Sequence, residues 1–138
     1  MYRVGCDICA IERIRRACEN RIAGFPRRVF SDQEIAEARE RADEVTYFAT
    51  RFAGKEAVFK ALDLPEMEVR LEEIEILARG NGRPSVTLLG HLREVCTSRG
   101  VRDIDLSLSN DTDYAMAVAI AEIGSAISGD GMTQGKDV

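Results

Sequence analysis

The hydrophobic pattern of the first half of the chain predicts one short strand followed by helices. Residues 2–8 are rich in apolar residues and lack a helical period, which indicates a strand, whereas residues 10–18 place their apolar residues on one helical stripe. Ser31 and Glu34 have the spacing of a capping box, so a second helix is expected to begin at about Asp32. The chain is therefore expected to enter its first helix directly from a strand.

A third helix is expected over residues 47–62, with Thr46 as its cap. Four bulky apolar residues fall within a narrow arc of this helix, and the arc is the predicted core face. These residues are Phe48, Phe52, Phe59 and Leu62. Lys55 lies about 20° from Phe48 on the helical wheel, inside the arc, where an unpaired ammonium group would be costly. The charged end of Lys55 must therefore reach solvent or meet an anion.

The second half of the chain changes to a period of two. Residues 73–77 and 85–88 are predicted to be strands, and Asn81–Gly82 between them is a strong signal for the tight turn of a hairpin. A helix is predicted over residues 89–98, and residues 104–109 alternate between apolar and polar residues as a half-buried strand does. The second half is therefore expected to consist mainly of strands.

A turn over residues 110–113 is predicted to lead into a last strand, whose two faces differ. Met116, Val118 and Ile120 lie on one face, and the other face carries only alanines. These are Ala115, Ala117, Ala119 and Ala121. An all-alanine face indicates that another element approaches closely, and both a helix packed on the sheet and a subunit interface fit this pattern.

Together these elements predict one α+β domain over residues 1–123, in which a small, largely antiparallel sheet packs on a long helix. Residues 124–138 are polar, glycine-rich and without a period, which predicts a disordered tail. The length of 138 residues, with 45% hydrophobic and 31% charged residues, is typical of one soluble globular domain.

Composition argues against several classes of protein. The chain contains no run of about 18 apolar residues that could span a bilayer, and its first residues lack the apolar segment of a secretory signal. A cytoplasmic protein without membrane association is therefore expected. A net charge of −5 argues against a general affinity for nucleic acid. The four cysteines are too few and too unevenly placed for a disulfide scaffold, so reduced thiols are expected.

Zinc and hydrolase chemistry have little support in the sequence. Cys6 and Cys9 match the C-x-x-C pattern, but no second pair follows and His91 is the only histidine. Residues three apart in a strand also point to opposite faces. With one histidine and no glycine-flanked serine, a catalytic triad is not supported.

Positive charge is concentrated near the N-terminus. Residues 1–30 contain seven arginines and three acidic residues, so this segment carries a net charge of +4 in an acidic chain. Such a segment indicates either a specific acidic partner or a solvated, arginine-rich helix face.

Asp7 and Glu56 each allow a structural and a functional interpretation. Asp7 ends a predicted strand, where functional groups are commonly presented, and the same position suits a cap for the helix that follows. Glu56 and Lys60 are four residues apart with the glutamate first, a spacing that by itself indicates a surface ion pair worth about 0.2–0.5 kcal/mol.

Four segments of the chain resemble, in order, the motifs of the holo-acyl-carrier-protein synthase family of 4′-phosphopantetheinyl transferases. They are VGCDICAIERI, YFATRFAGKEAVFKAL, GNGRPSV and IDLSLSNDTDYAMAVAI, and they are distributed over nearly the whole range of residues 2–123. The resemblance implies the 4′-phosphopantetheinyl transferase fold. It also implies an enzyme that uses Mg²⁺ to move the phosphopantetheine arm of coenzyme A onto a serine of an apo acyl carrier protein, releasing adenosine 3′,5′-bisphosphate.

The resemblance also implies roles for individual residues. The metal-binding carboxylates fall on Asp7 and Glu56, and catalytic roles fall on Glu56 and Lys60. Contacts with coenzyme A are implied for Arg51, Lys55, Lys60, Ser109 and Asn110. The arginine-rich first helix is expected to bind the carrier protein through Arg13, Arg16 and Arg21.

Further expectations from the resemblance concern the partner and the assembly. The nucleophile belongs to the carrier protein, so the chain needs no activated serine or cysteine of its own. A homotrimer with active sites between neighbouring subunits is expected, and fatty acid biosynthesis is the expected setting.

Two segments depart from the pattern of the family. Asn110 stands where a histidine is common, and residues 62–67, LDLPEM, replace a glycine-rich turn, both within the family's coenzyme A cleft. An asparagine carries no charge, so phosphate binding is expected to be weaker by about 1–2 kcal/mol. A non-catalytic or repurposed homologue that binds a carrier protein or coenzyme A is therefore the alternative function, and a structural subunit is a third. The presence of Asp7, Glu56 and Lys60 together favours the enzyme.

Overall fold

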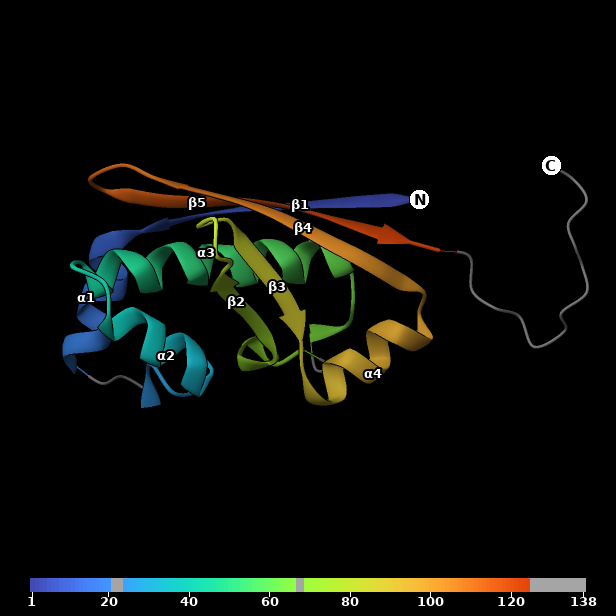
Figure 1. Ribbon diagram of the computed structural model, residues 1–138, viewed down its shortest axis with the longest axis horizontal. Coiled ribbons are helices and arrows are strands. Elements are labelled where there is room, and N and C mark those ends of the chain that lie inside the picture. Colours follow the sequence, from blue (N-terminus) through green and yellow to red (C-terminus); the bar gives the residue numbers. More distant parts are fainter. Residues whose placement is uncertain (21–23, 67–68, 125–138) are drawn as a thin grey trace, which may run out of the picture.

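The fold is organised around the long helix α3 (Glu44–Leu62). A computed structural model describes residues 1–20, 24–66 and 69–124. In chain order, the other elements are β1 (Tyr2–Ala10), α1 (Ile11–Asn20), α2 (Asp32–Arg39), the 3₁₀ helix η3 (Leu71–Glu73), β2 (Ile74–Ala78), β3 (Pro84–Leu88), α4 (Gly90–Ser98), β4 (Val101–Asn110) and β5 (Tyr114–Ile123). An antiparallel sheet in the order β1–β5–β4 covers one side of α3, α2 lies on the side away from the sheet, and the β2–β3 hairpin flanks α3 next to β4 (Figure 1). The predicted α+β fold, with a small antiparallel sheet on a long helix, is confirmed.

The inner face of β5 allows α3 to approach the sheet closely. The alanines on this face are at most 1% exposed, and they are Ala115, Ala117, Ala119 and Ala121. Because an alanine side chain is a single methyl group, the helix backbone can lie near the strand backbone. The packed helix is therefore the explanation of the all-alanine face within this chain.

The opposite face of the same sheet carries large hydrophobic side chains that remain exposed within this chain. Those on β5 are 40–51% exposed and those on β1 are 65–66% exposed. We call this surface the outer apolar face, and its members are Tyr2, Val4, Ile8, Tyr114, Met116, Val118 and Ile120. A contiguous apolar surface of this kind is typical of an interaction site.

Capping residues fix the starts of α2 and α3, one as predicted and one not. The capping box between Ser31 and Glu34 is present at the start of α2. Thr46, however, is not the cap of α3. The cap is Asp43, whose carboxylate accepts hydrogen bonds from the backbone N–H of Thr46 at 3.0 Å and from its hydroxyl at 2.7 Å. The helix therefore begins at Glu44, three residues earlier than predicted.

The predicted core face of α3 is wrong in part. Phe48 and Leu62 are buried, but Phe52 and Phe59 are only partly buried. The fully buried positions include small residues, namely Ala49, Ala53, Ala57 and Ala61. A helical wheel ranks faces for a helix with one covered side, whereas this helix is covered on two sides and its small residues make the closest contacts.

A buried ion pair joins α2 to α3 and to the start of β2. Nζ of Lys55 lies 2.7 Å from Oε1 of Glu34, and it also donates hydrogen bonds to the carbonyl oxygens of Leu71, at 2.9 Å, and Ile74. The carboxylate of Glu34 accepts a further bond from the N–H of Ile76 at 2.8 Å. Both side chains are fully buried. Burial lowers the pKa of Lys55, and the adjacent Glu34 acts in the opposite direction.

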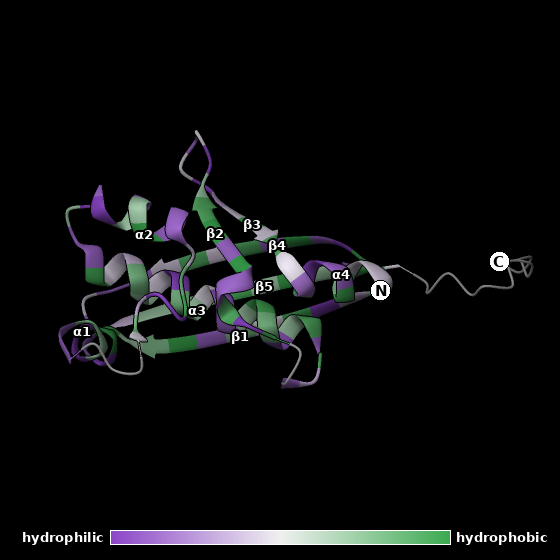
Figure 2. Cartoon of the chain, turned by 90° about the horizontal axis from the view of Figure 1, so that it is seen from below, coloured by the Kyte–Doolittle hydropathy of each residue, from purple (hydrophilic) through white to green (hydrophobic). Residues whose placement is uncertain are grey.

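The predicted hairpin is confirmed, and its strand bounds lie within one residue of the predicted ones. Ile74 and Ile76 of β2 are fully buried. Figure 2 shows that hydrophobic residues predominate on β2, whereas the turn between β2 and β3 is mainly hydrophilic. In this turn Gly82 has a φ of 84°, a conformation that favours glycine.

Within the described part of the chain, no helix is long and apolar enough to cross a membrane. The predicted disordered tail, apart from Gly124, lies outside the described residues.

Candidate active site

Asp7, Glu56 and Lys60 come together where β1 packs on the C-terminal half of α3. Nζ of Lys60 lies 3.4 Å from Oδ1 of Asp7 and donates a hydrogen bond of 3.0 Å to the carbonyl oxygen of Cys6. Glu56 precedes Lys60 by about one helical turn, so both side chains lie on the same side of α3. We call Asp7, Glu56 and Lys60 the carboxylate cluster.

The electrostatic state of Glu56 reflects its surroundings. Burial raises the pKa of Glu56, the negative charge of Asp7 raises it further, and Lys60 and Arg13 act in the opposite direction. Two carboxylates that repel each other in a partly buried place favour a cation between them. The cluster is therefore suited to bind a positively charged group.

The donor set of the cluster fits a metal ion that is shared with a substrate. Among the described residues, no group of three or more histidine, cysteine, aspartate or glutamate side chains could hold a metal. Asp7 and Glu56 offer carboxylate oxygens, which Mg²⁺ prefers, and Mg²⁺ usually takes only one or two carboxylates together with water and substrate phosphate. Cys6 is exposed and Cys9 is buried, as expected for opposite faces of a strand, so these two thiols do not form a shared site.

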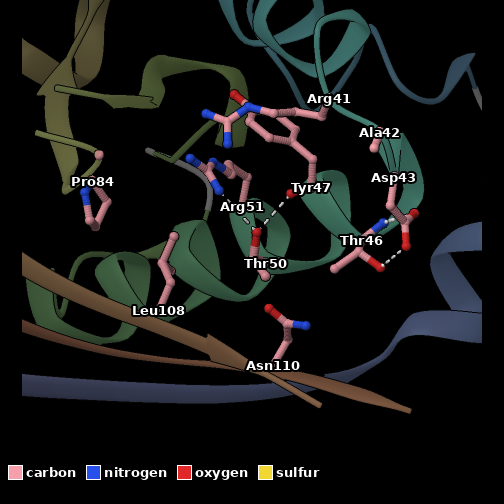
Figure 3. Close-up of a pocket in the computed structure, with 11 residues that line it drawn as sticks. Arg41, Ala42, Asp43, Thr46, Tyr47, Thr50, Arg51, Pro84, Leu108 and Asn110 are labelled. Atoms are coloured by element: carbon pink, nitrogen blue, oxygen red, sulfur yellow. Dashed lines mark hydrogen bonds between the residues drawn. The ribbon is translucent and has the colours of Figure 1, made fainter. Parts of the chain in front are cut away.

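A second group of predicted residues lines a pocket of about 430 Å³ beside the N-terminal half of α3 (Figure 3). Arg51 is only 9% exposed, and its guanidinium lies 4.1 Å from the centre of the Tyr47 ring. Nη1 of Arg51 donates to Oγ1 of Thr50 at 3.2 Å, and Nη2 lies 3.7 Å from the carboxylate of Glu37. Nε of Arg51 is buried and makes no hydrogen bond. The pocket therefore has a buried cation with an unused donor in its wall.

The end of β4 contributes the other two predicted residues. Asn110 lines the pocket of Arg51 and also borders a smaller hollow of about 260 Å³, which is lined in addition by Ser109, Ile8 and Met116. Nδ2 of Asn110 donates a hydrogen bond of 3.3 Å to the carbonyl oxygen of Asp111. Ser109 thus faces the outer side of the sheet, and Asn110 lies at the boundary between the two hollows.

The structure contradicts the predicted contact between Lys55 and coenzyme A. The Lys55 side chain is 0% exposed, and its ammonium donates to Glu34 and to the carbonyl oxygens of Leu71 and Ile74. An ammonium has three protons, and all three are used inside the protein. Of the two alternatives that the helical wheel left open, solvent or an anion, the structure shows the anion, and it is a glutamate of α2.

Comparison with known proteins identifies the family. Residues 3–119 match the profile of the 4′-phosphopantetheinyl transferase superfamily. The chain belongs to this superfamily. The holo-[acyl-carrier-protein] synthase of Ruminiclostridium cellulolyticum is 39% identical to this transferase over 123 residues, which cover 88% of this chain and 92% of the relative. That of Caldanaerobacter subterraneus is 36% identical over 118 residues, covering 86% and 92% of the two chains. The resemblance to the holo-acyl-carrier-protein synthases is thus confirmed.

Solved structures show that the transferase also shares the fold of this family. A holo-[acyl-carrier-protein] synthase from Neisseria meningitidis matches with a TM-score of 0.80 and 29% identity, over 87% of this chain and 97% of that one. A complex of such a synthase with coenzyme A from Chronobacterium ammoniagenes matches with a TM-score of 0.81 and 28% identity, over 91% and 99%. The predicted 4′-phosphopantetheinyl transferase fold is confirmed.

The arginines predicted to bind the carrier protein lie on α1 of the transferase or just after it. The guanidinium of Arg13 is 5.8 Å from the centre of the Phe52 ring, and its charge acts on Glu56. Arg16 is 73% exposed, with its Nε 3.4 Å from the carboxylate of Glu12. Arg21 lies outside the described residues. Arg13 is therefore close to the carboxylate cluster, and Arg16 faces solvent.

Sequence analysis of the transferase missed Arg41, Tyr47 and Thr50, which line the pocket of Arg51. Tyr47 and Arg51 are one helical turn apart, and that spacing was a signal that they would meet. Arg41 precedes the helix, with its guanidinium 5.4 Å from the centre of the Tyr47 ring. Its place depends on how the chain turns between α2 and α3, which no sequence pattern indicated.

Proposed function

We propose that the protein transfers the 4′-phosphopantetheine arm of coenzyme A to a serine of an apo acyl carrier protein in a reaction that depends on Mg²⁺. The observation that carries this proposal is the carboxylate cluster, in which Asp7 of β1 meets Glu56 and Lys60 of α3. The names of the relatives, which are synthases of the holo carrier protein, and the coenzyme A complex of a structural neighbour support it.

In this reaction the serine oxygen of the carrier protein bonds to the β-phosphorus of coenzyme A, and the serine proton passes to solvent. The bond from that phosphorus to adenosine 3′,5′-bisphosphate breaks, and this group leaves with the electron pair. Asp7 and Glu56 are the residues that would hold Mg²⁺, which when bound neutralises pyrophosphate oxygens and the charge of the leaving group. Lys60, beside Asp7, adds a positive charge at the same place. Phosphoryl transfer depends mainly on positioning and charge neutralisation, so the chain needs no nucleophile of its own.

We assign phosphate groups of coenzyme A to the pocket of Arg51 and Asn110. The buried guanidinium of Arg51 has an unused Nε donor, which an anionic oxygen would satisfy. Asn110 offers an amide that can donate a hydrogen bond but carries no charge. Lys55 has no part in this binding, because its donors are occupied in the core.

We infer that the active site is shared between copies of the chain in a homotrimer. Arg51 and Glu56 are about 140° apart around α3, and Asn110 and Asp7 lie on β4 and β1, the two edge strands of the sheet. The two groups of site residues therefore lie on different sides of α3, and we infer that one coenzyme A molecule contacts residues of two copies. The outer apolar face supports this assembly, since a stable interface would cover its exposed side chains.

We infer that the carrier protein docks on α1. Arg13 places positive charge next to the carboxylate cluster, where the serine of the carrier must arrive, and Arg16 presents a second charge to solvent on the same helix. Carrier proteins are expected to be acidic around this serine, so charge attraction would guide docking.

The direct test is the intact mass of apo acyl carrier proteins after incubation with the protein, coenzyme A and Mg²⁺. A gain of one phosphopantetheine group is expected. Asp7→Ala and Glu56→Ala are each expected to lower the rate by about a hundredfold or more, because each removes a ligand from a metal that takes few protein ligands. Asp63→Ala is the matched control, since it removes an exposed carboxylate at the end of the same helix.

Two results would contradict the proposal. The first is no mass shift on any carrier protein while a known transferase modifies the same samples, which would favour a homologue that only binds. The second is a normal rate for Asp7→Ala or Glu56→Ala, which would return that residue to a structural role.

A further inference from the structure

The closest contact between β1 and α3 is made at Gly5. An ideal Cβ on Gly5 would lie 2.0 Å from the carbonyl oxygen of Ala57, 2.7 Å from the backbone nitrogen of Ala61 and 3.0 Å from Cβ of Lys60. The first two are backbone atoms of a helix that is buried on two sides, so they cannot move aside as the end of a side chain can. Gly5 does not have a positive φ, unlike several other glycines of the described chain, so its backbone conformation does not require glycine. Glycine is required at this position because there is no space for a Cβ.

Gly5 lies on the same face of β1 as Asp7. Residues two apart in a strand point to the same side, and the partners of Gly5 and Asp7 on β5 are Ala119 and Ala117, both buried on the α3 side of the sheet. A Cβ added to Gly5 would contact Cβ of Lys60, and Nζ of the same lysine reaches Asp7. The separation of the two backbones at Gly5 therefore sets the separation of Asp7 from α3.

We propose that Gly5 is a positioning residue for the carboxylate cluster. Its lack of a side chain lets β1 lie on α3 at the distance at which Asp7 and Glu56 can share one divalent cation. This inference rests on the proposed function, because it takes these two carboxylates as the metal ligands.

A methyl group at position 5 would disturb the carboxylate cluster, because its steric conflict with α3 is too large to be relieved by small adjustments. Real Cβ contacts are essentially never shorter than 3.0 Å, so relieving the 2.0 Å contact needs a shift of about 1 Å or more. Functional constellations must be held to within about 0.5 Å of their productive geometry. Because Asp7 is two residues from Gly5 on the same strand, it moves with the displaced backbone.

Gly54 offers a matched control for a purely structural effect. It is also a tightly packed glycine, on α3 itself, but its added Cβ would meet ends of side chains, at 2.8 Å from Ile76, 3.1 Å from Leu108 and 3.3 Å from Leu106. These residues lie on β2 and β4, away from β1. Gly54→Ala therefore disturbs core packing without moving Asp7.

The test measures binding of Mn²⁺, a paramagnetic substitute for Mg²⁺, to the full chain, with and without coenzyme A. Electron paramagnetic resonance of free aqueous Mn²⁺ gives the bound fraction, independently of catalytic activity. Gly5→Ala is expected to weaken Mn²⁺ binding at least tenfold, and Gly54→Ala to change it less than twofold, although both lower the melting temperature. Asp7→Ala gives the level of Mn²⁺ binding that remains when the carboxylate cluster is not intact.

Equal Mn²⁺ binding by Gly5→Ala and Gly54→Ala, with a wild type that binds Mn²⁺ and transfers phosphopantetheine, would overturn this inference and leave the proposed function intact. If instead the wild type binds no more Mn²⁺ than Asp7→Ala and transfers without a divalent metal, the proposed metal ligands are wrong and the role of Gly5 fails with them.

If Gly5→Ala does not fold, a second pair of variants tests the same contact between β1 and α3. Ala117→Val adds bulk opposite Asp7 on the neighbouring strand, and Ala121→Val adds the same bulk opposite Arg3, farther from the cluster. Ala117→Val is expected to weaken Mn²⁺ binding at least tenfold and Ala121→Val less than twofold. Equal binding by these two variants would overturn the inference.

Discussion

Lys55 and Lys60 lie five residues apart on α3 and carry the same charge in opposite settings. Lys60 is 52% exposed and extends across the edge of the helix to Asp7, whereas Lys55 is fully buried against Glu34. A buried pair of charges is costly to break, because removing one partner leaves the other charged and without solvent. An exposed pair contributes little, because water screens both charges.

This contrast predicts different effects of the same substitution at the two positions. Lys55→Met is expected to lower the free energy of unfolding by about 3–5 kcal/mol, because Glu34 would remain buried without its cation. Lys60→Met, as the control, is expected to change it by less than about 1 kcal/mol. Urea denaturation of both variants measures the difference. Equal stability of the two variants would show that the buried pair is not formed in solution.

The sequence could predict that Lys55 must reach solvent or meet an anion, but not which of the two, nor which anion. Its position inside the apolar arc follows from helical geometry alone. Glu34, however, is 21 residues away in another helix, and only the packing of α2 on α3 brings the two together. Because a phosphate and a carboxylate would satisfy the same ammonium equally well, the family motif led to the wrong partner.

Among the elements, α3 depends on its first turn, where Asp43 is the cap. The hydrogen bond from the backbone N–H of Thr46 is the main cause that lowers the pKa of Asp43, and the bond from the Thr46 hydroxyl is the next. The folded state therefore holds the ionised carboxylate more strongly than the unfolded chain does. Such a group adds stability above its unfolded pKa, and this stability is lost as the pH falls through the folded pKa.

Asp43→Ala is accordingly expected to lower the free energy of unfolding by about 1 kcal/mol at pH 7. The gap between wild type and variant should narrow as the pH falls below about 4, because the carboxyl group is protonated first in the unfolded chain and then, at its lowered pKa, in the folded protein. Asp43→Asn keeps an acceptor oxygen without the charge, and its stability relative to Asp43→Ala should not depend on pH in this range. Urea denaturation at pH 7 and pH 3 measures both effects. A gap between wild type and Asp43→Ala that stays constant would contradict the role of the charged cap.

The types and order of the elements could be predicted because each element carries its own period and its own end signals. Which residues of α3 are buried could not be predicted, since a helical wheel ranks residues by size and assumes that one side meets the core. Here Gly5 and the alanines of β5 bring the sheet backbone to the small residues of α3, which a single-helix analysis cannot detect. The roles of Asp7, Glu56 and Lys60 came from the family motifs, and their convergence needed the packing of β1 on α3.

For the molecule as a whole, the outer apolar face and the separation of the two groups of site residues argue for assembly. Val118→Asp places a charge at the centre of this face, and it is expected to convert the proposed trimer to a monomer because an interface core excludes unpaired charge. Light scattering after size-exclusion chromatography measures the mass, and transfer activity should fall with it. Thr87→Asp, at an exposed position of β3 outside this face, is the control.

A wild type that is already monomeric at micromolar concentration and fully active would contradict the shared site. A trimeric and active Val118→Asp variant would place the interface elsewhere.

The two unlike faces of β5 have a consequence for insertions and deletions. One side of this strand is alanine against the helix, and the other side is bulky. Because side chains alternate, one residue gained or lost inside residues 115–121 would turn methionine, valine and isoleucine toward α3 for the remainder of the strand. The space there admits only methyl groups, so the strand could not pair in the shifted phase. A length change in the turn of residues 111–113 would leave the phase of both strands unaltered, so natural length variation is expected in that turn and not in β5.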